Sequence, residues 1–384
     1  MKIKSLSIKN NFLGWEFDEI NFSSNLTLLV GVSGVGKTQI LRAIDDLQDI
    51  ANGKSINGFE WRIIFSTVLE KEFTWEGAFT VSEDSEKQFN IVFEGENENE
   101  DKRKPTILFE RLREGKSDTY LIQRDEDTIR FNGNIMPKLS STQSMIHILR
   151  EENNIKEVID AFKKIVFKDH TRREGVRIAF SSKPFIQLKE KYTNLEEIKN
   201  SNEDIRLKLF LCSGLNLSIF NVVRNRFIEI FPQIEDIKIE QLDEENFPFR
   251  TEQTIPIISI KEKDVPKWIR EDRMSSGMLR TIIHICEIYL SNDGSVILID
   301  EFENSLGINC IDILTDDLIH ENKTLQFIAT SHHPYIINNI PYEYWKIVSR
   351  KGGKIQVRDA SGYNLGKSKQ DAFLQLTKIL EKQL

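Results

Sequence analysis

The sequence has 384 residues, of which 39% are hydrophobic and 29% charged, and its 52 basic and 60 acidic side chains give a formal net charge of −8. This composition excludes a disordered or collagen-like protein, and so acidic a surface does not attract nucleic acid as a whole. We find no apolar run that could cross a bilayer and no signal peptide, and the three scattered cysteines are typical of a reducing compartment, so we expect a cytoplasmic protein of two or three lobes without a membrane partner.

The first part of the chain predicts a strand, a glycine loop and a helix. Residues 25–30 form an apolar run that ends at a glycine, and residues 38–50 carry apolar side chains at helical spacing. Short β-like segments separated by polar breaks follow, at residues 61–65, 78–81, 89–93, 107–112 and 119–122. The charged stretch 94–104 predicts an exposed hairpin tip.

The rest of the chain alternates between helical and strand-like patterns. Helical spacing predicts helices at residues 141–166, 203–231, 277–289 and 311–320, and further helices that begin near Pro334 and near Lys369. Apolar runs predict strands at residues 234–240, 254–260, 296–299 and 325–329, with two weaker strands in the last forty or so residues. The two ends of the chain therefore indicate an α/β fold, with a mixed insertion between them.

The glycine loop carries the strongest chemical signal in the sequence. Gly31 to Thr38, GVSGVGKT, matches the phosphate-binding pattern GxxxxGK[ST] and stands between the predicted strand and helix, as that pattern requires. Backbone N–H groups of such a loop cradle phosphates, Lys37 neutralises β- and γ-phosphate oxygens, and the Thr38 hydroxyl ligates Mg²⁺. The residues predicted to bind nucleotide here are Gly31, Ser33, Gly34, Val35, Gly36, Lys37, Thr38 and Gln39.

A pair of acidic residues follows the apolar run at residues 296–299 and is the second chemical signal. Asp300 and Glu301 stand at the carboxyl end of that predicted buried strand. Asp300 can hold Mg²⁺, and Glu301 can orient the attacking water and act as general base. The alternative is a buried strand that simply runs into an acidic surface turn.

Two further segments extend the predicted site. In RMSSGMLR, residues 273–280, Ser275, Ser276 and Gly277 open a helix and can bind an anion, although serine is also an ordinary helix cap. Because Lys37 already serves this chain's own nucleotide, a second anion site suggests a γ-phosphate presented by another subunit. His332 follows a strand, where a neutral imidazole could donate to the γ-phosphate.

These segments in this order resemble the ABC-type ATPase head, and more narrowly the OLD-like and SMC-like stand-alone ATPases. The resemblance rests on the GVSGVGKT loop, LFER at 108–111, RMSSGMLR, ILIDEFENSL and ATSHHP. It implies a P-loop NTPase with a mixed central sheet, an N-terminal antiparallel β layer and an inserted α+β/helical region. We expect an N-terminal lobe at 1–135, the insertion at 136–265 and a C-terminal lobe at 266–384.

By that resemblance, the bound molecules are ATP and Mg²⁺, and each segment has a role. Glu301, His332 and Lys37 are catalytic, Thr38 and Asp300 bind the metal, and Ser275 to Gly277 close over the ATP of a partner subunit. Residues 304–306 form the D-loop, although the sequence continues Leu-Gly-Ile where relatives often have His-Pro. Ser276 and Met278 replace the glycine and glutamine of transporter heads. Gln143 is one candidate for the Q-loop glutamine, and a polar helix-start residue is the other interpretation.

The resemblance also suggests what the ATPase serves. Too few residues follow His332 for the nuclease domain of OLD-type proteins, and no heptad arms separate the two halves. The ATPase subunits of Septu-type and PARIS-type antiphage systems are therefore the nearest analogy. It implies a homo-oligomer that sandwiches ATP and regulates a separate effector protein, a nuclease.

Three alternatives stay open at this level. A DNA-repair or replication ATPase that contacts DNA directly is supported by basic residues at 170–177 and by Arg224 and Arg226. The nucleotide-binding subunit of a transporter needs a membrane partner, and the atypical signature and the β-rich region speak against it. A binding module that never hydrolyses ATP is disfavoured because Glu301 is present.

Overall fold

The structure is a computed structural model that describes residues 1–82, 104–115, 117, 119–168, 185–241, 255–303, 308–317, 319, 324–333, 337, 340–362 and 375. It divides into two compact units. The first unit comprises Met1–Lys168, Gly294–Asp300 and Gln326–Leu384, and the second comprises Asp169–Asp293 and Glu301–Leu325.

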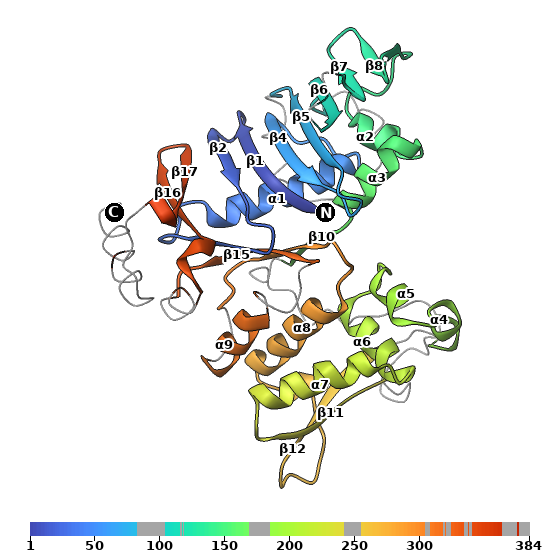
Figure 1. The fold of residues 1–384 in the computed structure, drawn as a ribbon, viewed down its shortest axis with the longest axis vertical. Coiled ribbons are helices and arrows are strands. Elements are labelled where there is room, and N and C mark those ends of the chain that lie inside the picture. The colour runs from blue at the N-terminus through green and yellow to red at the C-terminus, as the bar shows by residue number, and fades with distance from the viewer. Residues whose placement is uncertain are drawn as a thin grey trace, which may run out of the picture. The chain divides into compact units, whose positions relative to one another are not determined.

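One large mixed sheet forms the first unit (Figure 1). Its parallel part runs in the order β10 (Ile165–Lys168), β14 (Val296–Ile299), β15 (Gln326–Ser331), β3 (Leu26–Val30) and β16 (Trp345–Lys351). After β17 (Lys354–Asp359), which pairs antiparallel with β16 and parallel with β2, the sheet continues as an antiparallel layer. That layer contains β2 (Trp15–Asn21), β1 (Lys2–Asn10), β4 (Phe59–Ser66), β5 (Glu72–Phe79), β6 (Ile107–Glu114), β7 (Ile122–Arg124), β8 (Ile129–Phe131) and β9 (Asn134–Ile135).

Helix α1 (Lys37–Ala51) anchors the core of this unit. It buries the apolar stripe that the sequence predicts and contacts β10, β15, α2 (Met145–Ile148) and α3 (Asn153–Phe162). The Gln48 amide donates hydrogen bonds to the carbonyls of Phe162, at 2.7 Å, and Ile165, at 3.0 Å. The Phe162 ring meets Phe65 and Trp75 edge-on at centroid distances of 5.1 and 5.0 Å, so α3 is fixed to the antiparallel layer.

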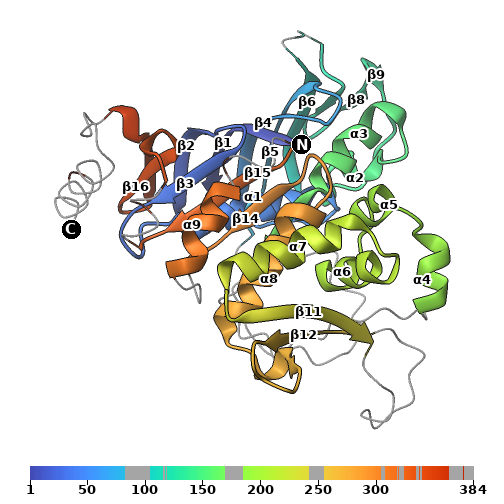
Figure 2. The same ribbon diagram turned by 60° about the horizontal axis from the view of Figure 1, so that its bottom comes forward.

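Helices dominate the second unit. They are α4 (Phe185–Lys191), α5 (Leu195–Lys199), α6 (Ile205–Gly214), α7 (Ser218–Ile230), α8 (Ser276–Leu290) and α9 (Ile308–Asp316). A small antiparallel sheet accompanies them, formed by β11 (Ile234–Gln241), β12 (Pro256–Glu262) and β13 (Ile269–Arg270). Helices α6 and α7 lie over β11 and β12 (Figure 2), and α8 packs against α6, α7 and α9. Single 3₁₀ turns complete the described elements at Glu271–Arg273, Tyr342–Tyr344 and Ala360–Gly362.

Most predicted elements are confirmed, and two long predicted helices are interrupted. The helix predicted at 203–231 breaks into α6 and α7, which are bent by 116°. Asn216 has a φ of +53°, its N–H bonds to the Ser213 carbonyl, and the Leu217 N–H bonds to the Cys212 carbonyl. This is a Schellman motif, in which a left-handed asparagine ends the helix.

The second interrupted helix is the one predicted at 141–166. It contains α2 and α3 and then ends, because Ile165 to Lys168 pair in parallel with β14 as strand β10. The β-branched and aromatic residues at 165–167 suit a buried parallel strand better than a further helical turn. Residues 136–168 thus belong to the first unit, although the expected insertion begins at residue 136. Helix α8 lies in the second unit, although its residues fall within the expected C-terminal lobe at 266–384.

Several predicted segments fall outside the described residues. They are the strand at 89–93, all but Lys104 of the hairpin tip at 94–104, most of the helix near Pro334 and most of the helix near Lys369. Among the helices that the structure describes, none by itself is long and apolar enough to cross a membrane, although the bent pair α6 and α7 together reaches the required length and composition.

Candidate functional site

The phosphate-binding loop joins β3 to α1, as predicted. Gly34 and Gly36 have φ values of +85° and +101°, a region that residues with a Cβ rarely adopt, so the loop needs glycine at both positions. Among the residues that the structure describes, no side chain caps α1, and the first turn of α1 contains no acidic residue. Such N–H groups at a helix start can bind an anion.

Lys37 is buried inside this loop. Its side chain is 8% exposed, and its ammonium donates to the carbonyls of Gly31, at 2.8 Å, and Val32, at 3.0 Å. The cation thus lies among the residues predicted to surround the phosphates. The exposed Ser33 and Gly34 form the rim of the loop, while Val35 packs into the core.

Three parallel strands bring the predicted metal ligands together. Strand β15 lies between β14 and β3, so the carboxyl end of β14 faces the start of α1 across one strand. The Thr38 hydroxyl donates to both carboxylate oxygens of Asp300, at 3.1 and 2.9 Å, and the Thr330 hydroxyl donates to one of them at 2.6 Å. Asp300 is only 3% exposed. Two residues separated by 262 positions in the sequence therefore share one contact.

This arrangement fits Mg²⁺. Magnesium prefers oxygen ligands and is usually held by one or two carboxylates together with substrate phosphates and water. Asp300 and Thr38 supply one carboxylate and one hydroxyl. Among the residues that the structure describes, no three His, Cys, Asp or Glu side chains gather into a metal site. The donor set therefore suits a metal that arrives with its nucleotide.

Glu301 directly follows Asp300 in a left-handed backbone conformation with a φ of +48°. Such a conformation is strained for a residue with a Cβ and requires support from its surroundings. His332 lies just past the end of β15 and is exposed, and the His333 N–H bonds to the Ser331 hydroxyl at 3.1 Å. The predicted D-loop, residues 304–306, lies outside the described residues.

The predicted signature segment opens α8 in the second unit. The Ser275 side chain caps this helix by accepting a hydrogen bond from the Met278 N–H at 3.2 Å, so the helix-cap interpretation is confirmed. Ser275 and Ser276 are both exposed, and Gly277 is half-buried. A capped but exposed helix start remains accessible from outside the chain.

Sequence reasoning assigned no role to two residues that the structure places at this site. Thr330 is one, and the signal was its position in the ATSHHP segment, next to β14 in a parallel sheet. Arg350 is the other, and its guanidinium donates to the Gln39 side chain at 2.9 Å. Only the pairing of β16 with β3 brings Arg350 there, and a single sequence does not reveal that pairing.

Other candidate residues lie elsewhere. Gln143 precedes the Ser144 cap of α2, and its backbone carbonyl accepts a hydrogen bond from Arg124 at 3.0 Å. Arg224 pairs with Asp236 at 2.5 Å. Arg226 pairs with Glu229 at 2.9 Å and also with the buried Asp317. The basic residues at 170–177 lie outside the described residues.

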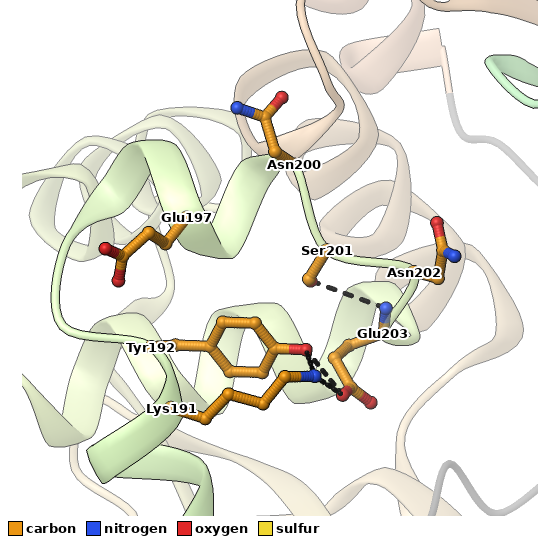
Figure 3. Close-up of a pocket in the computed structure, with 7 residues that line it drawn as sticks. All are labelled: Lys191, Tyr192, Glu197, Asn200, Ser201, Asn202 and Glu203. Carbon is orange, nitrogen blue, oxygen red and sulfur yellow. Dashed lines mark hydrogen bonds and ion pairs between the residues drawn. The ribbon is translucent and has the colours of Figure 1, made fainter. Parts of the chain in front are cut away.

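The second unit holds an open pocket of about 530 Å³ between α4, α5 and the start of α6 (Figure 3). Its lining is polar and consists of Lys191, Tyr192, Glu197, Asn200, Ser201, Asn202 and Glu203. The Tyr192 hydroxyl donates to Glu203 at 2.9 Å. None of the residues predicted to bind nucleotide lines this pocket.

Comparison with known proteins gives one family and several solved structures. The family described as "AAA domain, putative AbiEii toxin, Type IV TA system" matches residues 26–338. No curated protein matches the chain. The family match, the parallel strands, the phosphate loop and the antiparallel layer confirm the expected fold class, an α/β P-loop ATPase head of the ABC type.

Three solved structures are similar to this chain, each with 14–15% identity. "Crystal structure of the SmcHead bound to the C-winged helix domain of ScpA" has a TM-score of 0.48 and 15% identity, and the match covers 93% of this chain and 97% of that chain. "SMC head domain from Thermotoga maritima" has a TM-score of 0.41 and 14% identity, with 94% and 99% covered. The Smc head domain with an extended coiled coil bound to the C-terminal domain of ScpA, derived from Pyrococcus furiosus, has a TM-score of 0.47 and 15% identity, with 98% and 99% covered.

Proposed function

Because the chain belongs to the family described as "AAA domain, putative AbiEii toxin, Type IV TA system", we propose that it binds ATP with Mg²⁺ and hydrolyses it. The observation that carries this proposal is the contact of Thr38 and Thr330 with the buried carboxylate of Asp300 beside an uncapped helix start. An acidic surface turn would leave Asp300 exposed, whereas it is 3% exposed. A carboxylate and a threonine hydroxyl beside a phosphate-binding loop are the protein ligands that a Mg²⁺–nucleotide site uses.

In the proposed reaction, the chain's own residues bind and orient the triphosphate. The N–H groups of the loop and of the first turn of α1 bind phosphate oxygens, and Lys37 exchanges the carbonyls of Gly31 and Val32 for β- and γ-phosphate oxygens. Thr38 and Asp300 would hold Mg²⁺, which neutralises charge on the phosphates.

The chemical step needs a base and a donor. Glu301 orients a water molecule and takes its proton as the water oxygen bonds to the γ-phosphorus and the bond to the bridging oxygen breaks. His332 donates a hydrogen bond to the γ-phosphate and responds to its loss. The products are ADP and inorganic phosphate.

We further propose that two copies of the chain sandwich ATP and regulate a separate effector, a nuclease, in antiphage defence. The exposed start of α8 at Ser275 and Ser276 supports the sandwich, because it presents hydroxyls and a helix N-terminus to a second copy. The resemblance to Septu-type and PARIS-type ATPase subunits supports the effector. Hydrolysis would remove the γ-phosphate that bridges the copies and release the effector.

A tagged Glu301→Gln variant tests both the proposed ATP hydrolysis and the proposed regulation of an effector by an ATP-bound dimer. Loss of the base should trap the ATP-bound dimer, so a pull-down with Mg-ATP from the host cell should recover a dimer together with a nuclease. Glu126→Gln, a charge-matched change in an exposed loop between β7 and β8, serves as the control and should not trap it. A dimer carrying nuclease-sensitive DNA would support direct DNA binding instead. An ATP-bound monomer would contradict the sandwich.

A further inference from the structure

Arg280 on α8 is a half-buried cation with two buried nitrogen atoms that lack hydrogen-bond partners in the described part of the chain. Its Nε and Nη2 atoms are buried and have no hydrogen-bond partner among the residues that the structure describes. Leaving such donors unsatisfied is energetically costly, and more so when the group is charged. Burial lowers the pKa of Arg280, and the negative charges of Glu287, Glu301 and Glu303 oppose that shift. The guanidinium therefore lies among three carboxylates.

The packing of α8 shows which part of the chain faces Arg280. Positions 280, 284 and 287 share one face of the helix. On that face the His284 ring contacts the Phe302 ring at a centroid distance of 6.0 Å, and Phe302 is only 1% exposed. The turn at 301–303 therefore packs on the same helix face as Arg280.

The three carboxylates belong to two different elements of the second unit. Glu287 lies 3.0 Å from the His284 ring nitrogen, within α8 itself. Glu301 and Glu303 belong to the turn, and Glu301 has the strained φ of +48°. A guanidinium with two unsatisfied N–H groups can hold a carboxylate by paired hydrogen bonds, which are stronger and more directional than a single bond.

We propose that Arg280 is a positioning residue that holds the carboxylate of Glu301 in place for hydrolysis. This inference rests on the proposed function, because Glu301 is the base of that reaction. It gives the signature helix a task within its own chain, in addition to its proposed contact with the nucleotide of a second copy.

The proposed pairing of Arg280 with Glu301 would couple the two proposed sites. Arg280 stands five residues after Ser275, about 7.5 Å along the helix axis at 1.5 Å per residue. A helix moves as a rigid element, so a phosphate that engages Ser275 also displaces Arg280. Closure of the dimer at one site would therefore set the orientation of Glu301 at the other.

The test compares Arg280→Gln and Arg280→Lys with Arg206→Gln. Arg206 is a matched control, because it is a guanidinium of the same unit with a side chain only 16% exposed, paired with Glu271 at 3.8 Å. Steady-state ATP hydrolysis gives kcat and KM, equilibrium titration gives ATP affinity, and thermal melting reports folding. We expect Arg280→Gln to lower kcat about 10–100-fold, the scale of a misplaced catalytic group, while KM and ATP affinity change less than about threefold. Arg280→Lys should recover part of kcat.

Each other outcome overturns the inference. Unchanged kcat in Arg280→Gln refutes it and leaves the proposed function standing. An equal loss in Glu303→Gln means that Arg280 acts through Glu303 instead. Parallel losses of melting temperature and ATP affinity in both Arg280 variants mean that the residue is structural. A wild-type chain that does not hydrolyse ATP refutes the proposed function and the inference together.

Discussion

At the scale of single residues, the site depends on a few hydrogen bonds to one buried carboxylate. Asp300 receives hydroxyl donors from Thr38 and Thr330, and each comes from a different neighbouring strand or helix. A buried carboxylate loses its water and must be compensated by such donors. The two threonine hydroxyls thus orient the Asp300 carboxylate before any ligand binds.

Thr330→Val tests this orientation. The substitution keeps the shape of the side chain and removes the donor that lies 2.6 Å from Asp300. We expect a loss of about 1–3 kcal/mol in the free energy of unfolding, because a charged acceptor loses a buried partner. Denaturant unfolding measures it, and ATP hydrolysis should need a higher Mg²⁺ concentration.

Thr315→Val is the matched control for that experiment. Thr315 is 4% exposed, and its hydroxyl has no hydrogen-bond partner among the described residues, so its loss should be neutral or stabilising. Equal destabilisation by both variants would show that the Thr330 hydroxyl contributes nothing specific.

Lys37→Ala should reduce ATP affinity by roughly 10–100-fold, the value of a hydrogen bond to a charged group. The ammonium now satisfies two loop carbonyls, and these can turn to water when the side chain is removed. Isothermal titration with ATP measures the change. Lys4→Ala removes an exposed lysine paired with Glu72 and should leave affinity unaltered. Intact ATP binding in Lys37→Ala would refute the assigned site.

Asp46 predicts a pH dependence of stability. Burial, followed by the charges of Asp45 and Asp49, raises its pKa from 3.8 to about 7. The folded state therefore binds this proton more tightly than the unfolded state does. Its contribution to stability is complete below about pH 4 and is lost as the pH rises towards 7.

Asp46→Asn should remove that slope. The variant should match the wild type near pH 4 and exceed it at pH 8 by about 1–3 kcal/mol, as a neutral side chain carries no ionisation cost. Thermal melting from pH 4 to pH 8 follows both proteins. If the two melting curves stay parallel across this range, Asp46 keeps an ordinary pKa.

At the scale of elements, the sequence correctly predicted the strands and helices that have a clear apolar periodicity. The apolar run at 296–299 became β14 with the same bounds, and the stripe at 38–50 became α1. Periodicity alone missed the Asn216 turn and assigned Ile165 and Val166, which begin strand β10, to a helix. Their pairing with β14 is a contact between distant segments, and no local pattern encodes it.

The candidate site divides in the same way. Glycines at positive φ and a lysine in a fixed motif were predictable, because the chemistry lies within eight consecutive residues. Thr330 and Arg350 were not, because their places depend on the order of β14, β15, β3 and β16. The strand order of the sheet decides which distant residues lie beside a motif, and the motif itself does not encode that order.

The buried Glu110 carboxylate on β6 joins this strand to β5 and to the start of α2. It is fully buried on β6 and accepts hydrogen bonds from Trp75, at 3.0 Å, from Ser144, at 2.5 Å, and from the Met145 N–H, at 2.8 Å. Glu110→Ala would leave three donors unsatisfied, and we expect a loss of about 3–5 kcal/mol. Glu110→Gln keeps an acceptor and should lose less in urea unfolding. Equal losses would indicate that the negative charge of the carboxylate matters, and not an acceptor or the packing volume at this position.

At the scale of the whole molecule, the charge distribution speaks against direct electrostatic attraction to DNA. The net charge is −8, and Arg224 and Arg226 are neutralised by acidic neighbours. Electrostatic attraction to a nucleic acid backbone needs clustered, uncompensated cations. An acidic chain that binds a triphosphate at one site can instead join a second copy through that ligand.

Ser275→Asp tests this association without disturbing the fold. Aspartate caps helices as well as serine does and suits the positive end of α8, so the helix should start at the same residue. Its negative charge, however, would face the γ-phosphate presented by the second copy. In the Glu301→Gln background with Mg-ATP, we therefore expect native mass spectrometry to show a monomer that still binds ATP. Ser275→Asn, an equally good but neutral cap, should retain much of the dimer. If the aspartate variant dimerises as the asparagine variant does, Ser275 is only a helix cap, and the copies must meet through another surface.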